Sequence, residues 1–317
     1  MKINHIYCGD AVQVLKDFPD ESIDCCITSP PYYALRDYSS PQQIGTEKTV
    51  TEYIQKLLSI FLEIHRVLKK DGTFWLNLGD TYSYISRGSG GHDKTKSSVQ
   101  LKNMGSYYKD NIYDVNLKSS NLKQKDLMGI PWTIALALRN KIGFYLRQDI
   151  IWAKPNPMPE SVKDRCTKSH EYIFLLSKSK KYYFDSDAIK EKANEKSALR
   201  YKCRFNTGTK EMFVNKRLNQ HSNTAGFKKF TGYRNKRDVW FIPPKGYKGA
   251  HFATFPEELI KPCILAGCRE NGIVLDPFFG SGTVGVVAKQ LHRNYIGIDI
   301  NEDYCSLAKK RIENEGN

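Results

Sequence analysis

The sequence lacks long apolar runs, a signal-peptide core and any cysteine arrangement typical of a metal site. Across its 317 residues, no stretch approaches about 18 apolar residues, so no membrane-spanning helix is expected. The first five residues do not form the apolar core of a signal peptide. Eight cysteines are scattered, and none belongs to a Cys-x-x-Cys pair. This usage is typical of a reducing cytoplasm and predicts neither disulfides nor a zinc site.

Acidic residues are too few to balance the basic ones. The chain has 49 Lys and Arg against 34 Asp and Glu, a net charge of +15, which favours a polyanionic partner such as nucleic acid. Residues 186–238 alone hold 14 Lys or Arg and five Asp or Glu, a balance of +9, with aromatic residues between them. This combination predicts a segment that reads duplex DNA through phosphates and base edges. A solvated basic loop is the alternative interpretation.

A glycine-rich turn, Asp-Pro-Phe-Phe-Gly-Ser-Gly-Thr at residues 276–283, follows the apolar run Ile273–Leu275. A predicted helix from Val284 to Leu291 comes next. A short β-branched run before such a turn predicts a buried parallel strand. In open α/β sheets, ligands bind at the carboxyl edge of the strands. Gly280 and Gly282 have no Cβ, so the backbone there can approach a ligand closely.

This turn differs from a dinucleotide-binding fingerprint, because it lacks the third glycine. It also places Asp276 and two phenylalanines where a pyrophosphate would lie. A second predicted strand, 295–298, ends at Asp299, at the spacing where such folds place an acid for ribose hydroxyls. An acidic, aromatic site suits a cationic, aromatic cofactor without phosphate. The sequence therefore predicts an S-adenosyl-L-methionine site.

A second unusual turn, Ser29-Pro30-Pro31-Tyr32, follows the predicted buried strand Ile23–Thr28. Two prolines cannot continue a central strand, so the chain leaves the sheet there with stiff geometry. A nucleobase amine is a poor nucleophile because its lone pair is delocalised into the ring. The Ser29 hydroxyl and the Pro30 carbonyl could accept its two hydrogens and localise that pair, and the Tyr32 ring could stack on the base. The base would first leave the duplex.

The remaining segments complete an α/β pattern without internal repeats. Residues 83–127 are rich in Ser, Gly, Lys and Asn and predict a loop or insertion. The helix from Glu52 to Lys70 is expected to close at Gly72. The other predicted helices are 11–18, 131–140 and 257–266, and the other predicted strands are 6–8, 73–78, 146–152, 171–176, 180–184, 239–242 and the block 251–256.

Three blocks together resemble the β class of exocyclic-amino DNA methyltransferases, and more narrowly those that modify cytosine N4. They are Gly9-Asp10 with Thr28–Tyr32, then His251–Pro256, and finally Asp276–Thr283 with Gly297-Ile298-Asp299. The resemblance covers nearly the whole catalytic lobe, and the order of the blocks indicates the β class. It implies a Rossmann-like α/β sheet of seven strands with an inserted basic target recognition region.

The resemblance also assigns roles to segments. It implies a catalytic half at 1–82, a polar insertion at 83–127, further strands at 128–185, target recognition at 186–238 and a cofactor-binding half at 239–317. The implied catalytic residues are Ser29, Pro30, Pro31 and Tyr32. The implied cofactor-binding residues, around the methionine, ribose, adenine or pocket wall, are Asp10, Thr254, Phe255, Asp276, Phe278, Gly280, Ser281, Gly282, Thr283 and Asp299.

Several alternatives stay open. Related adenine-N6 enzymes usually carry Asp or Asn at the position of Ser29, but this residue does not fully determine the base, so adenine remains an alternative target. An RNA substrate and a non-catalytic DNA-binding module on the same fold are further alternatives. Cytosine C5 chemistry needs a Pro-Cys nucleophile after a central strand, whereas Cys263 lies in a predicted helix and is expected in the core. A prokaryotic, cytoplasmic, DNA-associated protein is expected, and a homodimer and a cognate restriction endonuclease stay open.

Overall fold

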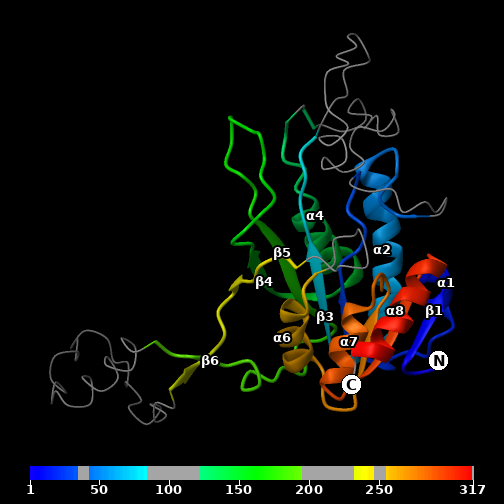
Figure 1. Cartoon of the computed structure of the whole chain (residues 1–317). Coiled ribbons are helices and arrows are strands. Elements are labelled where there is room, and N and C mark those ends of the chain that lie inside the picture. Colours follow the sequence, from blue (N-terminus) through cyan, green and yellow to red (C-terminus); the bar gives the residue numbers. More distant parts are fainter. Residues whose placement is uncertain (35–42, 84–121, 124, 195–231, 246–254, 316–317) are drawn as a thin grey trace, which may run out of the picture. The chain divides into compact units, whose positions relative to one another are not determined.

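The computed structural model describes residues 1–34, 43–83, 122–123, 125–194, 232–245 and 255–315 (Figure 1). These residues fall into two compact units. The larger unit comprises residues 1–184 and 238–317, and the smaller comprises 185–237. In the smaller unit, β6 (Glu191–Lys192) pairs antiparallel with β7 (Tyr233–Arg234). Most of the predicted 83–127 insertion lies outside the described residues, as do residues 251–254 of the predicted block 251–256.

The larger unit is built on one sheet with strand order β1-β10-β9-β2-β3-β5-β4-β8 (Figure 1). The first five strands in this order are parallel, β5 is antiparallel to both of its neighbours, and β8 is parallel to β4. The sheet strands are β1 (His5–Cys8), β2 (Ile23–Thr28), β3 (Leu68–Leu78), β4 (Tyr145–Ala153), β5 (His170–Ser177), β8 (Val239–Phe241), β9 (Ile273–Asp276) and β10 (Asn294–Asp299).

Helices cover both faces of this sheet. The main core cluster joins one face to α1 (Ala11–Lys16), α2 (Val50–Val67), α4 (Ile130–Ala137) and the π-helix η3 (Leu138–Ile142). A second group of packed helices contains α6 (Glu257–Gly267), α7 (Thr283–Gln290) and α8 (Glu302–Glu315). The predicted strands that flank the two unusual turns are fully or largely buried, as expected for a parallel sheet covered on both faces.

The α/β class predicted from the sequence is confirmed, with three local corrections. The sheet has eight strands among the described residues rather than seven, because the short strand β8 adds to the free edge of β4. The predicted strand 180–184 is wrong. It follows β5, which already has β3 and β4 on either side, so no free edge is available there. Instead, the Tyr183 amide donates to the Asp71 carbonyl (2.8 Å).

The third correction concerns the end of α2. The helix stops at Val67, and Leu68 already has extended backbone and starts β3. The strand register then jumps from the Ile23–Leu68 pair to the Cys25–Thr73 pair, so the residues between form a bulge. Gly72 lies in this bulge, where a Cβ would come within 2.7 Å of Leu68 Cγ. Close packing inside a strand, rather than helix termination, therefore explains this glycine.

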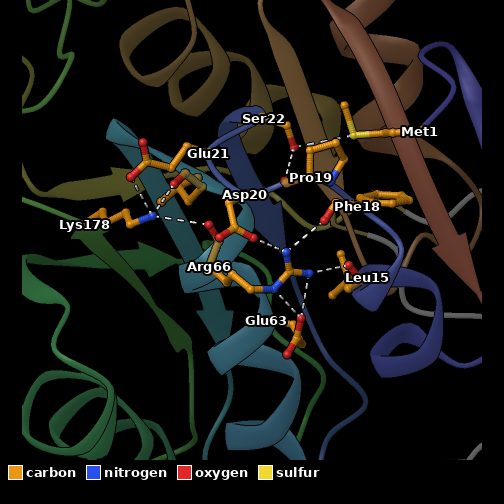
Figure 2. A network of polar contacts seen from close by, with 11 residues as sticks. Met1, Leu15, Phe18, Pro19, Asp20, Glu21, Ser22, Glu63, Arg66 and Lys178 are labelled. Carbon is orange, nitrogen blue, oxygen red and sulfur yellow. Dashed lines mark hydrogen bonds and ion pairs between the residues drawn. The ribbon is translucent and has the colours of Figure 1, made fainter.

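Arg66 joins the end of α2 to the turn before β2 (Figure 2). Its guanidinium donates to the carbonyls of Leu15 (2.7 Å) and Phe18 (2.8 Å), and it pairs with Asp20 and Glu63. These contacts fix the chain that leads into β2, and β2 carries the Ser29–Tyr32 turn at its carboxyl end.

A buried hydrogen bond also joins the ends of β2 and β9. Thr28 Oγ1 donates to Asp276 Oδ1 (2.6 Å), and the same oxygen accepts from the Phe278 amide (3.0 Å). Thr28 is fully buried and Asp276 is 1% exposed. Burial raises the pKa of Asp276 to about 7, although both hydrogen bonds oppose that rise. Two sheet strands are thus linked at the edge from which both unusual turns emerge.

We expect Arg66→Met to lower the free energy of unfolding by about 2 kcal/mol, because it removes several charge-assisted hydrogen bonds to partly buried acceptors. Urea denaturation measures this change. Lys70→Met is the control, since the Lys70 ammonium is 4.0 Å from Glu21 on a side chain that is 83% exposed and should contribute little. Equal losses in the two variants would show that the Arg66 contacts do not stabilise the fold.

We expect Asp276→Asn to flatten the pH dependence of stability in the cofactor-free protein. Because the folded-state pKa of Asp276 is raised, its contribution is complete below pH 4 and is lost as the pH rises through about 7. A rise from 3.8 to about 7 corresponds to about 4 kcal/mol. Urea denaturation from pH 4 to 8 compares the slopes, and a constant offset from the amide does not affect them. Parallel curves for the two proteins would contradict the assignment.

Candidate active site

One pocket of about 350 Å³ opens at the carboxyl edge of the sheet in the larger unit. Parallel strands end together at this edge, so turns far apart in sequence meet there. Its lining includes Ser29–Tyr32 after β2 and Pro277–Ser281 after β9. The structure therefore brings the two turns singled out in the sequence into one cavity. The other predicted site residues in the lining are Asp10, Phe255, Thr283 and Asp299.

Three predicted site residues are not in this lining. Thr254 lies outside the described residues. Asp276 is buried beside Thr28, where it links the two strands as described above. Gly282 packs against α8, and a Cβ there would come within 2.8 Å of Ala308 Cβ. Gly282 also has a positive φ of +78°, so helix packing and backbone conformation both require glycine at this position.

The glycine-rich turn is held at its other end by Asp299. Gly280 has a positive φ of +49°, and its amide donates to Asp299 Oδ2 (2.7 Å). The Asn301 backbone N–H donates to the other oxygen of Asp299, Oδ1 (2.9 Å). Burial raises the pKa of Asp299, while these backbone hydrogen bonds oppose the rise. The carboxylate thus shapes the turn and also faces the pocket.

The buried Arg311 of α8 also stabilises this turn through hydrogen bonds. Its guanidinium donates to Ser281 Oγ (3.2 Å) and Thr283 Oγ1 (2.9 Å), and it pairs with Glu257 (2.8 Å). Another turn residue, Phe279, is buried against Gly297, where a Cβ would come within 2.3 Å of its ring. The turn is therefore held by contacts with α8 and β10, and Arg311 is in turn paired with Glu257 of α6.

These residues fit S-adenosyl-L-methionine. Asp10 and Asp299 place two carboxylates on the pocket wall, and Phe278, Phe255 and Tyr304 supply aromatic surface. Asp10 also caps α1 by accepting from the Gln13 amide (3.0 Å). An acidic and aromatic wall suits a ligand that carries a sulfonium, an ammonium and an adenine ring.

Tyr32, which also lines the pocket, is fixed by contacts with residues distant in the sequence. Tyr32 Oη donates to Glu171 Oε2 (2.6 Å), and Ser29 Oγ donates to Tyr32 Oη (3.4 Å). Burial and the neighbouring Glu171 carboxylate raise the pKa of the Tyr32 phenol well above its ordinary value. The Tyr32 ring lies where a Cβ on Gly79 would be within 2.6 Å of it. Tyr53 Oη donates to the Pro31 carbonyl (2.8 Å).

The lining also includes residues that the sequence did not single out, among them Asn77, Trp152, Lys154 and Glu171. Lys154 forms an ion pair with Glu171, and its ammonium lies 4.3 Å from the centre of the Trp152 ring. Trp152 and Lys154 come just before Pro155, so a strand that runs into proline was a usable signal, as it was at Ser29. Glu171 begins an antiparallel strand and had no such signal.

Other candidate features are absent from the described part of the chain. Within it, no group of three or more His, Cys, Asp and Glu side chains could hold a metal ion. None of its helices is long and apolar enough to cross a membrane. Cys263 is 1% exposed in α6, and its thiol contacts the Leu259 carbonyl (3.3 Å), as expected for a core residue.

Known proteins match this chain along nearly its whole length. Residues 23–310 match the N6_N4_Mtase family of DNA methylases. The type II methyltransferase M.Cfr9I of Citrobacter freundii is 43% identical over 310 residues, 98% of this chain and 88% of that relative. The type II methyltransferase M.SmaI of Serratia marcescens is 44% identical over 307 residues, 97% and 90% of the two chains.

Two solved structures share the fold. The cytosine-N4-specific PvuII DNA methyltransferase superposes with a TM-score of 0.62 at 19% identity, covering 97% of this chain and 85% of that one. The Thermus thermophilus protein TTHA0409, in complex with S-adenosyl-L-methionine, gives a TM-score of 0.58 at 22% identity, covering 98% and 93%. Given its matches to the family and to the type II enzymes, this chain belongs to the N6/N4 family of DNA methylases, together with these type II methyltransferases.

Proposed function

We propose that this enzyme methylates the exocyclic N4 of a flipped-out cytosine in a specific sequence of double-stranded DNA. The observation that carries the proposal is the shared pocket, which both Ser29–Tyr32 and the Pro277–Ser281 turn line. A serine stands at the first position of the tetrad, where the related adenine-N6 enzymes usually carry Asp or Asn. The cytosine-N4 specificity named for the PvuII enzyme, which shares the fold, also supports this choice.

The tetrad has the groups that a cytosine amine requires. The Ser29 hydroxyl and the Pro30 carbonyl accept the two amine hydrogens, which localises the nitrogen lone pair toward the methyl donor. The two prolines hold these acceptors in a stiff turn, and Tyr53 fixes the adjoining Pro31 carbonyl. Tyr32 provides a ring on which the extruded base stacks, and this stacking offsets part of the cost of leaving the duplex.

The glycine-rich turn, Asp10 and Asp299 hold the cofactor. Phe278, Gly280, Ser281 and Thr283 surround its methionine part, Asp299 binds its ribose and Asp10 approaches its adenine. Bound S-adenosyl-L-methionine supplies an electrophilic methyl group on a sulfonium that is a good leaving group. The protein residues therefore need only hold the two partners in line and exclude water. No cysteine nucleophile is required.

We assign target recognition to residues 186–238 and the two halves of the catalytic lobe to residues 1–82 and 239–317. The compact unit 185–237 includes nearly all of the basic segment. Its described part keeps some of its own charges paired, since Arg234 contacts Glu191 (2.9 Å) and Lys190 contacts Asp187 (2.5 Å). A cognate restriction endonuclease and a homodimer stay predictions.

We expect Ser29→Ala to lower the methyl-transfer rate by about 100-fold or more, since it removes an acceptor of the reacting amine, while DNA binding is retained. The product is identified by digesting DNA methylated by the wild-type enzyme to nucleosides and measuring their masses. N4-methylcytosine supports the proposal, whereas N6-methyladenine as the sole product would move the activity to adenine. Full activity of the alanine variant would exclude the role given to Ser29.

We expect Lys216→Gln combined with Arg217→Gln to weaken DNA binding and reduce its salt dependence, because each lost phosphate contact lowers the slope of log K against log salt by about 0.9. Affinity is measured across a salt series by fluorescence anisotropy. Lys309→Gln combined with Lys310→Gln removes an adjacent exposed pair from α8 and is the matched control. A slope unchanged from wild type in the first variant would show that this pair does not contact phosphate.

A further inference from the structure

A chain of three polar groups runs from the reacting end of the pocket into the sheet. Ser29 Oγ donates to Tyr32 Oη (3.4 Å), which donates to Glu171 Oε2 (2.6 Å). All three residues line the pocket. An ionised carboxylate can only accept hydrogen bonds, so the phenol hydrogen points at Glu171 and the serine hydrogen points at the phenol oxygen. The hydroxyl hydrogens of Ser29 and Tyr32 therefore each have an acceptor within this chain of groups.

The carboxylate at the end of this chain is held from two sides. Asn77 Nδ2 donates to Glu171 Oε2 (3.2 Å) and also to the Tyr172 carbonyl (3.1 Å). The Lys154 ammonium pairs with the other oxygen, Oε1. The Glu171 side chain is 14% exposed. These partners lie on β3, β5 and the end of β4, so three sheet strands fix the carboxylate, and a site on strands is held more firmly than one on loops.

This arrangement favours Ser29 as a hydrogen-bond acceptor, rather than a donor, toward a base. A hydroxyl has one hydrogen and two lone pairs, and a freely rotating one could donate to the base instead of accepting from it. Because its hydrogen is directed to Tyr32, Ser29 presents lone pairs to the pocket. Glu171 acts on the base only through Tyr32 and Ser29, so it is a positioning residue.

We propose that Glu171 keeps Ser29 a hydrogen-bond acceptor through Tyr32 and receives the proton that the target amine loses. This inference rests on the proposed methylation of an exocyclic amine. It adds to that function a defined route for the proton and a residue from a strand remote from the tetrad in sequence.

The proton balance closes within the three residues. The methylated amine is a cation with one proton more than the product. Its N–H bond breaks as an O–H bond forms at Ser29, the original serine proton passes to Tyr32 Oη, and the phenol proton passes to Glu171. The base, Ser29 and Tyr32 end neutral, and Glu171 becomes a carboxylic acid that returns its proton to water. The 3.4 Å step has to shorten when the base binds, as catalytic hydrogen bonds often do.

The Lys154–Glu171 pair fits both stages of this route. Before the reaction the two charges compensate each other, so the end of the pocket near Tyr32 suits a neutral base. After the proton arrives, the Lys154 charge has lost its partner. The unpaired ammonium then favours loss of the proton from Glu171 to solvent, which restores the starting state.

The test compares Glu171→Gln, Tyr32→Phe and the double variant by single-turnover methylation at saturating DNA and cofactor, and by steady-state rates over a range of DNA and cofactor concentrations that gives KM. Each single variant is expected to lose about 100-fold in rate with KM values within about twofold of wild type, because binding groups are kept. The double variant is expected to be no more than about threefold slower than either, since both changes interrupt one route. Tyr32→Phe keeps the ring and tests the route independently if Glu171→Gln does not fold.

Glu63→Gln is the matched control and is expected to keep the wild-type rate. Like Glu171, Glu63 is a carboxylate paired with a cation, Arg66 (Figure 2). The Glu63 side chain is 17% exposed. Glu63 lies on α2 and is not part of the pocket lining. Wild-type rates in Glu171→Gln, or losses that multiply in the double variant, would overturn the inference. Nucleoside analysis of the wild-type product separates the two proposals. N4-methylcytosine with a fully active Glu171→Gln refutes only the proton route, and N6-methyladenine refutes only the choice of base.

Discussion

The hydrogen bond from Thr28 to Asp276 is the constraint on which the active site depends. Thr28 immediately precedes the Ser29–Tyr32 turn, and Asp276 immediately precedes the Pro277–Ser281 turn. A single bond of 2.6 Å between two buried side chains therefore fixes where both turns leave the sheet. Burying a carboxylate is costly, which the raised pKa of Asp276 reflects. This unfavourable burial occurs between the two turns that hold the cofactor and the base in the proposed mechanism.

The charged residues of the pocket lining differ in how their charges are compensated. Asp10 and Asp299 present acidic groups to the pocket, whereas Lys245, which also lines it, is paired with Glu258. On the base side, Glu171 is compensated by Lys154. In the proposed mechanism, the acidic groups match a cationic cofactor, and the compensated Lys154–Glu171 pair matches a neutral base. The direction of the Ser29–Tyr32–Glu171 hydrogen bonds then adds polarity to the neutral side.

The sequence could predict the parts of this site that depend on local chemistry. Two prolines after a buried strand, and two glycines after another, each mark a turn at a sheet edge, and the structure places both turns in one pocket. It could not predict contacts that depend on strand pairing. Glu171 reaches Tyr32 only because β5 runs antiparallel beside β3. The wrong strand at 180–184 has the same cause, since its run of three aromatic residues does not show that both edges of β5 are already paired.

Glycines illustrate the same limit at single positions. Gly280 and Gly282 are both expected near a ligand, yet only Gly280 lines the pocket, while Gly282 allows the close approach of α8. Gly72 looks like a helix terminator and instead accommodates a bulge in β3. Gly282 and Gly72 are thus required by tertiary contacts that local sequence does not encode, whereas Gly280 lies at the pocket as its turn predicts.

The most direct measurement is a crystal structure of the enzyme with S-adenosylhomocysteine and a duplex containing its target site. The structure is expected to show a cytosine outside the helix, stacked on Tyr32. Its N4 should lie within hydrogen-bond distance of Ser29 Oγ and the Pro30 carbonyl and face the cofactor sulfur. A target base bound away from Ser29–Tyr32, or a cofactor bound away from the Pro277–Ser281 turn, would contradict the mechanism.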